Sequence, residues 1–235
     1  MSDQIAALLP VKPLAYSKSR LASVLSPVDR RDLMLWMADH VLRALVGSGA
    51  LAQIYLVTAD PDVVELGRCH SAVIVEEPTR GLNRALETAR RQAVLDGAEA
   101  CLAVLGDLPR LSPQEVLALV GRLNGPSGMV IAPDSRHEGT NALLLRPPEL
   151  LPFAFGRHSY SAHLAAARDH GAAAAVFQSP GLSFDLDTPA DLDEFRRAAY
   201  RGELDPVTAD STEMPKSTRH DQRQVGLTHA CAAQS

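Results

Sequence analysis

The stretch Cys101-Leu102-Ala103-Val104-Leu105-Gly106-Asp107-Leu108-Pro109 decides the fold. Its first five residues are small or apolar and predict a buried strand, and the next four predict a turn that carries an aspartate. Two further apolar runs, Ile5–Leu9 and Leu182–Phe184, also predict strands, and each is followed by a charged segment. In an open α/β sheet, ligands bind beyond the carboxyl ends of the strands. We therefore expect the functional residues at these three junctions.

Apolar runs alternate with amphipathic segments along the rest of the chain. Further strands are expected at Gln53–Thr58, Ala72–Val75, Met129–Ala132, Ala142–Leu145 and Ala173–Phe177. Helices are expected after Ser26-Pro27, after Asp60-Pro61, over Gly81–Leu95, after Ser112-Pro113-Gln114-Glu115, and over Ser159–Asp169 and Pro189–Ala199. This alternation predicts an α/β fold in three layers, with a mainly parallel sheet and helices on both faces.

The length of 235 residues suits one domain with a substantial core. We expect this domain to cover residues 1–204. Beyond that point apolar periodicity stops, and the segment over residues 205–235 is rich in Ser, Thr, Asp, Gln and Arg. Such a composition offers little apolar surface to bury, so we expect a disordered or loosely attached tail.

The composition favours a small-molecule ligand. The net charge is −5 at pH 7 with both signs mixed along the chain, whereas a nucleic-acid partner requires a broad basic face. Because no apolar run approaches the roughly 20 residues that span a bilayer, and no signal-peptide pattern is present, we expect no membrane partner. The cysteines Cys69, Cys101 and Cys231 form no Cys-x-x-Cys pair, which favours a reducing cytoplasm and a core role for Cys101.

The loop after the first strand carries three cations, Lys12, Lys18 and Arg20. Cations grouped in this way can neutralise adjacent phosphates, and arginine can grip two oxygens at once. Pro10 begins a Pro-Val-Lys-Pro run that favours a rigid loop. Since the loop lacks the Gly-x-x-x-x-Gly-Lys-Ser/Thr pattern of a Walker loop, a solvated surface loop with ordinary charges is the alternative.

Three aspartates, Asp107, Asp185 and Asp187, are candidate ligands for Mg²⁺, which prefers hard oxygen donors. In an extended segment Asp185 and Asp187 would lie on one face and could bridge a metal. Asp107 also suits a turn, and either Asp187 or Thr188 also suits a helix cap. Asp185 has no such alternative role, which favours metal binding for the pair.

Three polar segments that contain glycine are candidate ligand loops. Gly81-Leu82-Asn83 precedes a helix, which Asn83 could cap while backbone amides face a ligand. Gly139-Thr140-Asn141 and Phe155-Gly156-Arg157-His158-Ser159 offer hydroxyls and glycine amides that suit a phosphate or a carboxylate. A cap alone, for the first segment, and ordinary turns, for the other two, are the alternatives.

Combined in this order, the motifs resemble those of the guanylyltransferases that make the phosphodiester precursor of the deazaflavin coenzyme F-420. These enzymes are a branch of the molybdenum-cofactor-type nucleotidyltransferase superfamily. The resemblance runs from Ile5 to about Phe195, with Gly106 as a conservative departure where the family more often has alanine. The matching motifs are Pro10-Val11-Lys12-Pro13-Leu14 with Lys18-Ser19-Arg20-Leu21, Thr58-Ala59-Asp60-Pro61, Gly81-Leu82-Asn83, Gly139-Thr140-Asn141-Ala142-Leu143-Leu144-Leu145 and Leu186-Asp187-Thr188-Pro189.

The resemblance implies a nucleotidyltransferase domain over residues 1–204, of the Rossmann-like nucleotide-diphospho-sugar transferase type. It implies transfer of GMP from GTP to a small phosphorylated acid, which would be 2-phospho-L-lactate, phosphoenolpyruvate or 3-phospho-D-glycerate. By motif match, the residues that would hold Mg²⁺ are Asp107, Asp185 and Asp187, and those that would hold the acceptor are Thr140, Gly156 and Ser159.

We expect the acceptor phosphate to attack the α-phosphorus of GTP in line and to release pyrophosphate. That phosphate is already ionised at neutral pH, so no strong general base is needed. Catalysis would rest on positioning and on neutralisation of charge by the metal and by catalytic Lys12, Lys18 and Arg20. The nucleotide-binding residues would be these three cations together with Pro10, Gly81 and Asn83.

The same residues also fit other functions. A different nucleotidyltransferase could act on a sugar phosphate or a molybdopterin, and a glycosyltransferase could use the Asp185-x-Asp187 pair. A non-catalytic regulator would bind GTP without turnover. The sequence leaves open the choice of acceptor and the oligomeric state, with a homodimer among the alternatives, and the choice of base rests on the resemblance alone.

Overall fold

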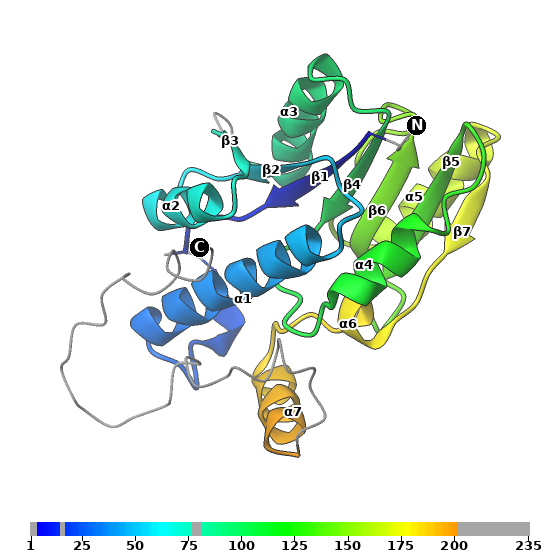
Figure 1. Cartoon of the computed structure of the whole chain (residues 1–235). Helices are drawn as coiled ribbons and strands as arrows, with labels where there is room; N and C mark the ends of the chain where they lie inside the picture. The colour runs from blue at the N-terminus through cyan, green and yellow to red at the C-terminus, as the bar shows by residue number, and fades with distance from the viewer. Residues whose placement is uncertain (1–3, 15–16, 77–80, 202–235) are drawn as a thin grey trace.

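The computed structural model describes residues 4–14, 17–76 and 81–201, so the tail expected over residues 205–235 lies outside the described residues. In the described part, seven strands form one sheet in the order β3-β2-β1-β4-β6-β5-β7 (Figure 1). The strands are β1 (Ile5–Pro10), β2 (Gln53–Val57), β3 (Val73–Val75), β4 (Ala100–Val104), β5 (Gly128–Pro133), β6 (Thr140–Arg146) and β7 (Ala174–Val176).

Every strand of this sheet except β6 runs in one direction. β1 is parallel to both β2 and β4, β2 is parallel to β3, and β5 is parallel to β7. β6 is antiparallel to its neighbours, with Leu144 opposite Leu102 of β4 and Leu143 opposite Ile131 of β5. The expectation of a mainly parallel sheet is confirmed, and the carboxyl ends of β1, β2 and β4 lie along one edge.

Most helices begin at the caps that the sequence predicts. The helices are η2 (Ser19–Leu21, of 3-10 type), α1 (Pro27–Gly47), α2 (Pro61–Cys69), α3 (Leu82–Leu95), α4 (Pro113–Val120), α5 (Ser159–Asp169), α6 (Pro180–Ser183) and α7 (Pro189–Tyr200). Ser26, Ser112 and Thr188 each form a reciprocal capping box, with proline in the first turn. These side chains pair amide groups that have no partner inside the helix, so the start of each helix is set locally.

Helices cover both faces of the sheet. Along β1, Ala7 and Leu9 pack in the core layer that contains the buried residues of α1, α2 and α4. The alternate residues Ala6 and Leu8 pack in the opposite layer, with α3 and α5. In Figure 1, α1 and α4 lie in front of the sheet and α5 lies behind it. This alternation is typical of a strand buried on both faces, and the three-layer α/β fold is confirmed.

The strand expected at Leu182–Phe184 is absent, and this expectation is wrong. Leu182 and Ser183 instead form the end of the short helix α6, which begins at Pro180 after the cap of Ser179, whose hydroxyl accepts from the amide of Leu182. A capping serine followed by proline favours a helix start over a strand. Asp185 and Asp187 therefore lie in an irregular segment between α6 and α7. They still reach the carboxyl edge of the sheet, because the amide of Leu186 donates to the carbonyl of Asp107 at 3.3 Å.

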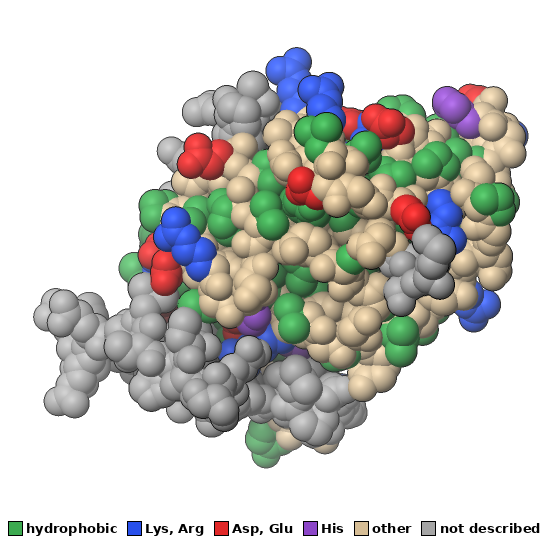
Figure 2. Space-filling model, turned by 45° about the horizontal axis from the view of Figure 1, so that its top comes forward, with side chains coloured by type: hydrophobic (Ala, Val, Ile, Leu, Met, Phe, Trp, Pro, Cys, Tyr) green, Lys and Arg blue, Asp and Glu red, His purple; other side chains and the backbone are tan. Residues whose placement is uncertain are grey.

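The charged side chains of the described residues are spread over the surface. Figure 2 shows Lys and Arg side chains near Asp and Glu side chains, with no broad basic patch on the face drawn there. Among residues 4–14, 17–76 and 81–201, no helix has the length and the apolar character needed to cross a membrane.

Candidate active site

The first loop is anchored at two points just beyond β1. The amide of Val11 donates to the carbonyl of Val57 at the end of β2, and the amide of Leu14 donates to Asp60 Oδ2, both at 2.9 Å. The side chain of Leu14 is buried in the same core layer as α1. Backbone and core contacts therefore hold the loop, while Lys12 stays exposed at the edge of the sheet.

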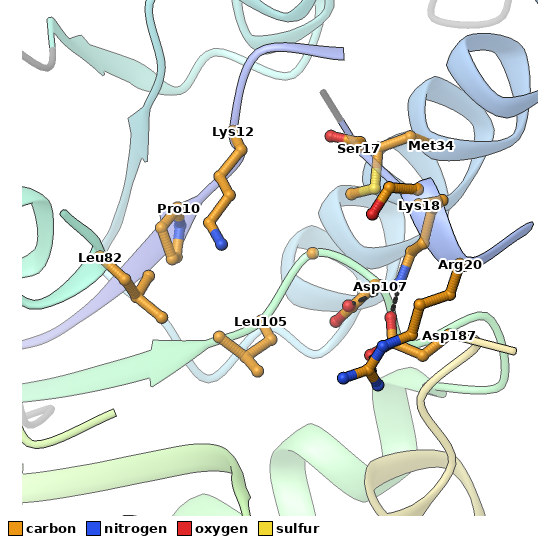
Figure 3. A pocket seen from close by; sticks show the side chains of 12 residues that line it. Pro10, Lys12, Ser17, Lys18, Arg20, Met34, Leu82, Leu105, Asp107 and Asp187 are labelled. Carbon is orange, nitrogen blue, oxygen red and sulfur yellow. Dashed lines mark hydrogen bonds and ion pairs between the residues drawn. The ribbon is translucent and has the colours of Figure 1, made fainter. Parts of the chain in front are cut away.

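Lys18 joins the first loop to two distant aspartates (Figure 3). Its Nζ lies 2.7 Å from Asp107 Oδ2 and 2.6 Å from Asp187 Oδ1, and its side chain is only 3% exposed. Arg20 is more remote, with its Nη1 3.9 Å from Asp187 Oδ2. The backbone of Lys18 is left-handed, with φ 54°, which is uncommon for a residue other than glycine. The three charged stretches singled out in the sequence thus meet at one ammonium group.

This ion pair is charged at neutral pH. Burial lowers the pKa of Lys18, but the carboxylates of Asp107 and Asp187 outweigh burial and hold that pKa above its usual value. Burial raises the pKa of Asp187, and the ammonium of Lys18 outweighs it, so that this pKa lies below its usual value. The ammonium of Lys18 and the carboxylate of Asp187 therefore favour each other's charged form.

Negative charge is nevertheless crowded at the site. Burial, followed by repulsion from Asp107 and Asp187, raises the pKa of Asp185 to about 6. Asp107 also has an oxygen, Oδ1, that is buried and has no hydrogen-bond partner among the described residues. A raised carboxyl pKa and a buried acceptor without a partner are both features of a place where a further cation would be stabilised.

The chemistry of this donor set fits a divalent metal, since Mg²⁺ prefers carboxylate oxygens. Among the residues that the structure describes, however, no group of three or more His, Cys, Asp or Glu side chains is arranged to hold a metal ion. Lys18 lies between Asp107 and Asp187 instead. The assignment of Mg²⁺ to Asp107, Asp185 and Asp187 stays a prediction.

A cavity of about 290 Å³ opens beside the ion pair. In Figure 3, Lys12 and Arg20 extend toward it from different sides, with Asp107 and Asp187 near its floor. Pro10 also lines it, and its role in binding a nucleotide stays a prediction. The apolar part of the lining comes from Met34, Leu82 and Leu105. The cavity combines cations that can hold phosphates with apolar surface that can hold the rest of a nucleotide.

A second cavity, of about 440 Å³, adjoins the first, and both are lined by Arg20 and Asp187. Asp185, Arg110 and Arg136 lie along its wall. Asp185 therefore reaches the site from the second cavity, whereas Asp107 lines only the first of the two. Two cavities that meet at shared charged residues suit a reaction between two substrates.

Asn83 does not cap α3, contrary to expectation. The capping position is Gly81, with φ +136° and no side-chain hydrogen bond, and Asn83 is the second residue of the helix. The Asn83 amide instead binds the backbone of Phe155 twice: its Nδ2 donates to the carbonyl at 3.0 Å, and its Oδ1 accepts from the amide at 2.8 Å. The cap expected for Asn83 is wrong because this side chain bonds Phe155 instead. Only the fold brings residue 155 within reach of α3.

The residues predicted to hold the acceptor lie in the region of β6 and α5. Thr140 and Ser159 are 2% and 1% exposed, and Gly156 is exposed with φ +136°. Thr140 Oγ1 lies 3.1 Å from His163 Nδ1. None of these three predicted residues lines either cavity described above. Their role in binding an acceptor stays a prediction.

Two residues that support the site escaped sequence reasoning. Asp60 does open α2, by accepting from the amide of Asp62 through Oδ1 at 3.1 Å, but its second oxygen also holds Leu14 of the cationic loop. Its position directly after β2, in Thr58-Ala59-Asp60-Pro61, was the available signal. His163 is buried in α5 and carries no sequence signal, because a single histidine in an amphipathic helix fits an ordinary core position.

The sheet order, the cationic loop beyond β1 and the aspartates at the carboxyl edge define a nucleotidyltransferase. Solved structures with the same fold include a putative nucleotide-diphospho-sugar transferase from Desulfovibrio desulfuricans G20, with a TM-score of 0.70 and 17% identity over 90% of this chain and 93% of that one. A nucleotidyl transferase from a Methanothermobacter species gives a TM-score of 0.65 and 18% identity, over 85% of this chain and 99% of that one.

The family model described as "Guanylyl transferase CofC like" matches residues 5–197, and the chain belongs to this family. A relative from Rubrobacter xylanophilus is 46% identical over 186 residues, which are 79% of this chain and 90% of the relative. One from Sphaerobacter thermophilus is 42% identical over 207 residues, which are 88% and 97% of the two chains. Both relatives are named phosphoenolpyruvate guanylyltransferase. The family resemblance inferred from the motifs is confirmed.

Proposed function

We propose that this protein transfers GMP from GTP to phosphoenolpyruvate and releases pyrophosphate. The observation that carries the proposal is the buried contact of Lys18 with Asp107 and Asp187, which joins the cationic loop to the acidic edge beside a cavity. The choice of phosphoenolpyruvate among the three phospho-acids follows the names of the relatives. Since the reaction consumes GTP, we place it in the cytoplasm.

The triphosphate of GTP occupies the first cavity in this proposal. Lys12, Lys18 and Arg20 line that cavity together with Pro10, and the three cations neutralise the phosphates. An oxygen of the acceptor phosphate attacks the α-phosphorus in line. The bond from the α-phosphorus to the bridging oxygen breaks, and the electron pair leaves with pyrophosphate. Positioning and charge neutralisation supply the catalysis, since the attacking phosphate is already ionised.

Asp107, Asp185 and Asp187 would hold Mg²⁺, which when bound neutralises charge on the phosphate groups of the substrates. The buried, unpartnered Oδ1 of Asp107 and the raised pKa of Asp185 support this assignment. Lys18 would then exchange part of its contact with the carboxylates for contact with the triphosphate.

Thr140, Gly156 and Ser159 would hold the phospho-acid. Ser159 is the first residue of α5, and the amino end of a helix favours an anion. Gly156 is exposed and has a positive φ, so its backbone is open to a ligand without a side chain in the way. These features support an anion at the start of α5, next to the cavity that Asp185 lines.

The test is a panel that crosses GTP, ATP, CTP and UTP with phosphoenolpyruvate, 2-phospho-L-lactate, 3-phospho-D-glycerate and a sugar phosphate, glucose 1-phosphate, in the presence of Mg²⁺. Pyrophosphate release and the mass of the product are measured for the full chain. We expect the fastest release from GTP with phosphoenolpyruvate, and a product that contains both GMP and the phospho-acid. GTP binding without release for any acceptor would favour the regulator, and release only with a sugar phosphate would favour another transferase.

A further inference from the structure

His163 contacts three separate parts of the predicted acceptor site, although its side chain lines neither cavity. Its Nε2 accepts from the amide of Ala154 at 3.0 Å, and its Nδ1 lies 3.1 Å from Thr140 Oγ1. The ring also hydrogen-bonds the backbone of Ser159, one turn earlier in α5. His163 is 0% exposed, so these contacts take place in the protein interior.

The hydrogen bonds determine which ring nitrogen carries the proton. A backbone amide can only donate, so Nε2, which receives the amide of Ala154, must be the acceptor nitrogen. Burial lowers the pKa of His163 to about 4, which keeps the ring neutral at physiological pH. The single proton of the neutral ring therefore lies on Nδ1 and is donated toward the Thr140 hydroxyl and the Ser159 carbonyl.

This arrangement leaves Thr140 as a donor. Its hydroxyl oxygen accepts from His163, and in the described part of the chain no other partner of this hydroxyl is found. The proton of the hydroxyl therefore has no acceptor among the described residues. An anionic phospho-acid binds to hydrogen-bond donors. By donating to the oxygen of Thr140, the ring of His163 leaves the hydroxyl proton of Thr140 to act as such a donor.

The backbone next to Gly156 is held from two further positions. Three successive amides each donate to a side chain: that of Phe153 to Glu87, that of Ala154 to His163, and that of Phe155 to Asn83. Asn83 also donates to the carbonyl of Phe155, so it fixes both polar groups of that residue. The segment that leads into Gly156 is thus clamped between α3 and α5 by hydrogen bonds to side chains.

We infer that His163 and Asn83 are positioning residues of the acceptor site: His163 orients the Thr140 hydroxyl, and both hold the segment over residues 153–155 that places Gly156. The inference rests on the proposed function, because it takes Thr140 and Gly156 as contacts of the phospho-acid. The sequence predicts that Asn83 contacts the nucleotide. The inference instead assigns Asn83 to the site of the phospho-acid, because its side-chain amide bonds the backbone of Phe155.

The first test is His163→Gln, whose Oε1 can accept from the Ala154 amide as Nε2 does, while no donor stands at the position of the ring Nδ1 beside Thr140. The KM for phosphoenolpyruvate should rise about tenfold, as for one lost hydrogen bond, with the KM for GTP within about twofold of wild type. His170→Gln is the matched control, because it makes the same change at an exposed position at the end of α5 and should leave both constants unchanged.

A double-mutant cycle separates positioning from general loosening. Thr140→Val should raise the same KM, and adding His163→Gln to it should cost little more, because both changes remove one interaction. Full additivity of the two changes would contradict an effect through Thr140.

Asn83→Ala keeps the inference testable if His163→Gln does not fold, since Asn83 is only half-buried. We expect a rise of about fivefold or more in the KM for phosphoenolpyruvate and little change for GTP. Thr88→Ala, at another half-buried position on the same helix, where the side chain bonds only the helix's own backbone at Arg84, is its control. A rise in the KM for GTP instead would restore the nucleotide role of Asn83 and overturn the inference.

The failure of the proposed function and that of this inference are distinguishable. If the wild type transfers GMP to no phospho-acid, the proposed function fails. If the wild type does transfer GMP and both variants match it, only this inference fails.

Discussion

Lys18 is the residue through which distant parts of this chain are linked electrostatically. It lies 89 positions from Asp107 and 169 from Asp187, yet its ammonium contacts both carboxylates. Removing one partner of a buried ion pair leaves a charge without compensation, which is costly, whereas exposed pairs contribute little. Arg20, whose side chain is 74% exposed, is therefore expected to add little to the stability of the free protein, and its contact with the phosphates stays a prediction.

Asp187→Asn should remove most turnover and leave the fold intact, because Lys18 keeps its ion pair with Asp107. The amide keeps the shape of the side chain but loses the charge that Lys18, and a metal, require. We expect a loss of about 100-fold or more in pyrophosphate release at saturating Mg²⁺, the size typical of an electrostatic catalytic group. Asp107→Asn should behave alike. Asp193→Asn, the same change at an exposed position on α7, should be silent. Rates like wild type in Asp187→Asn would rule out the metal assignment.

Asp185→Asn should stabilise the metal-free protein, and the gain should depend on pH. The pKa of Asp185 is about 6 in the folded protein, above its usual value of 3.8, because of burial and then repulsion from Asp107 and Asp187. Between these values the folded state binds more protons than the unfolded state, so wild-type stability falls as pH rises from about 4 to about 6. In EDTA, the Tm of the variant should exceed that of wild type near pH 7.5, and the difference should shrink near pH 4. A variant less stable than wild type near pH 7.5 contradicts this account.

At the scale of elements, the caps and the loops between them carry the site. The turn after β2 holds both α2 and the cationic loop, since Asp60 accepts from Asp62 through one oxygen and from Leu14 through the other. The positions of Lys12 and Lys18 thus depend on Asp60, which belongs to the turn after β2 and not to the cationic loop.

Asp60→Ser separates these two roles. A serine hydroxyl can still cap α2 but cannot also reach the Leu14 amide, so the KM for GTP should rise about five- to tenfold while the KM for phosphoenolpyruvate stays nearly constant. Ser112→Ala, which removes the cap of α4, is the control: it should cost about 1 kcal/mol of stability without moving the KM for GTP. Equal effects of Asp60→Ser on both substrates would point to general loosening of the fold.

At the scale of the whole molecule, the tail over residues 205–235 should be dispensable. The family match ends at residue 197, and the composition beyond residue 204 offers little apolar area to bury. Deletion of residues 205–235 should leave GMP transfer unchanged and shift the Tm by less than about 4 °C. A larger fall in the Tm, measured by thermal unfolding in the same buffer, would show that the tail packs on the domain.

The sequence by itself determined the local features of this protein. Caps such as Ser26 and Ser112 set the starts of helices, and short apolar runs predicted the seven strands, because these signals act between residues a few positions apart. The one wrong strand, at Leu182–Phe184, failed for the same reason: two apolar residues on either side of a serine fit a strand or a buried helical turn equally well, and the cap at Ser179 decided the outcome.

Only the tertiary structure decided which of these residues meet. The antiparallel placement of β6, the contact of Lys18 with Asp107 and Asp187, the burial of Thr140 and Ser159, and the hold of Asn83 on Phe155 all join residues far apart in the chain. Such contacts depend on strand order and on how helices pack, and local periodicity contains neither. The charged groups of the candidate site could therefore be predicted from the sequence, whereas their partners depend on the tertiary structure.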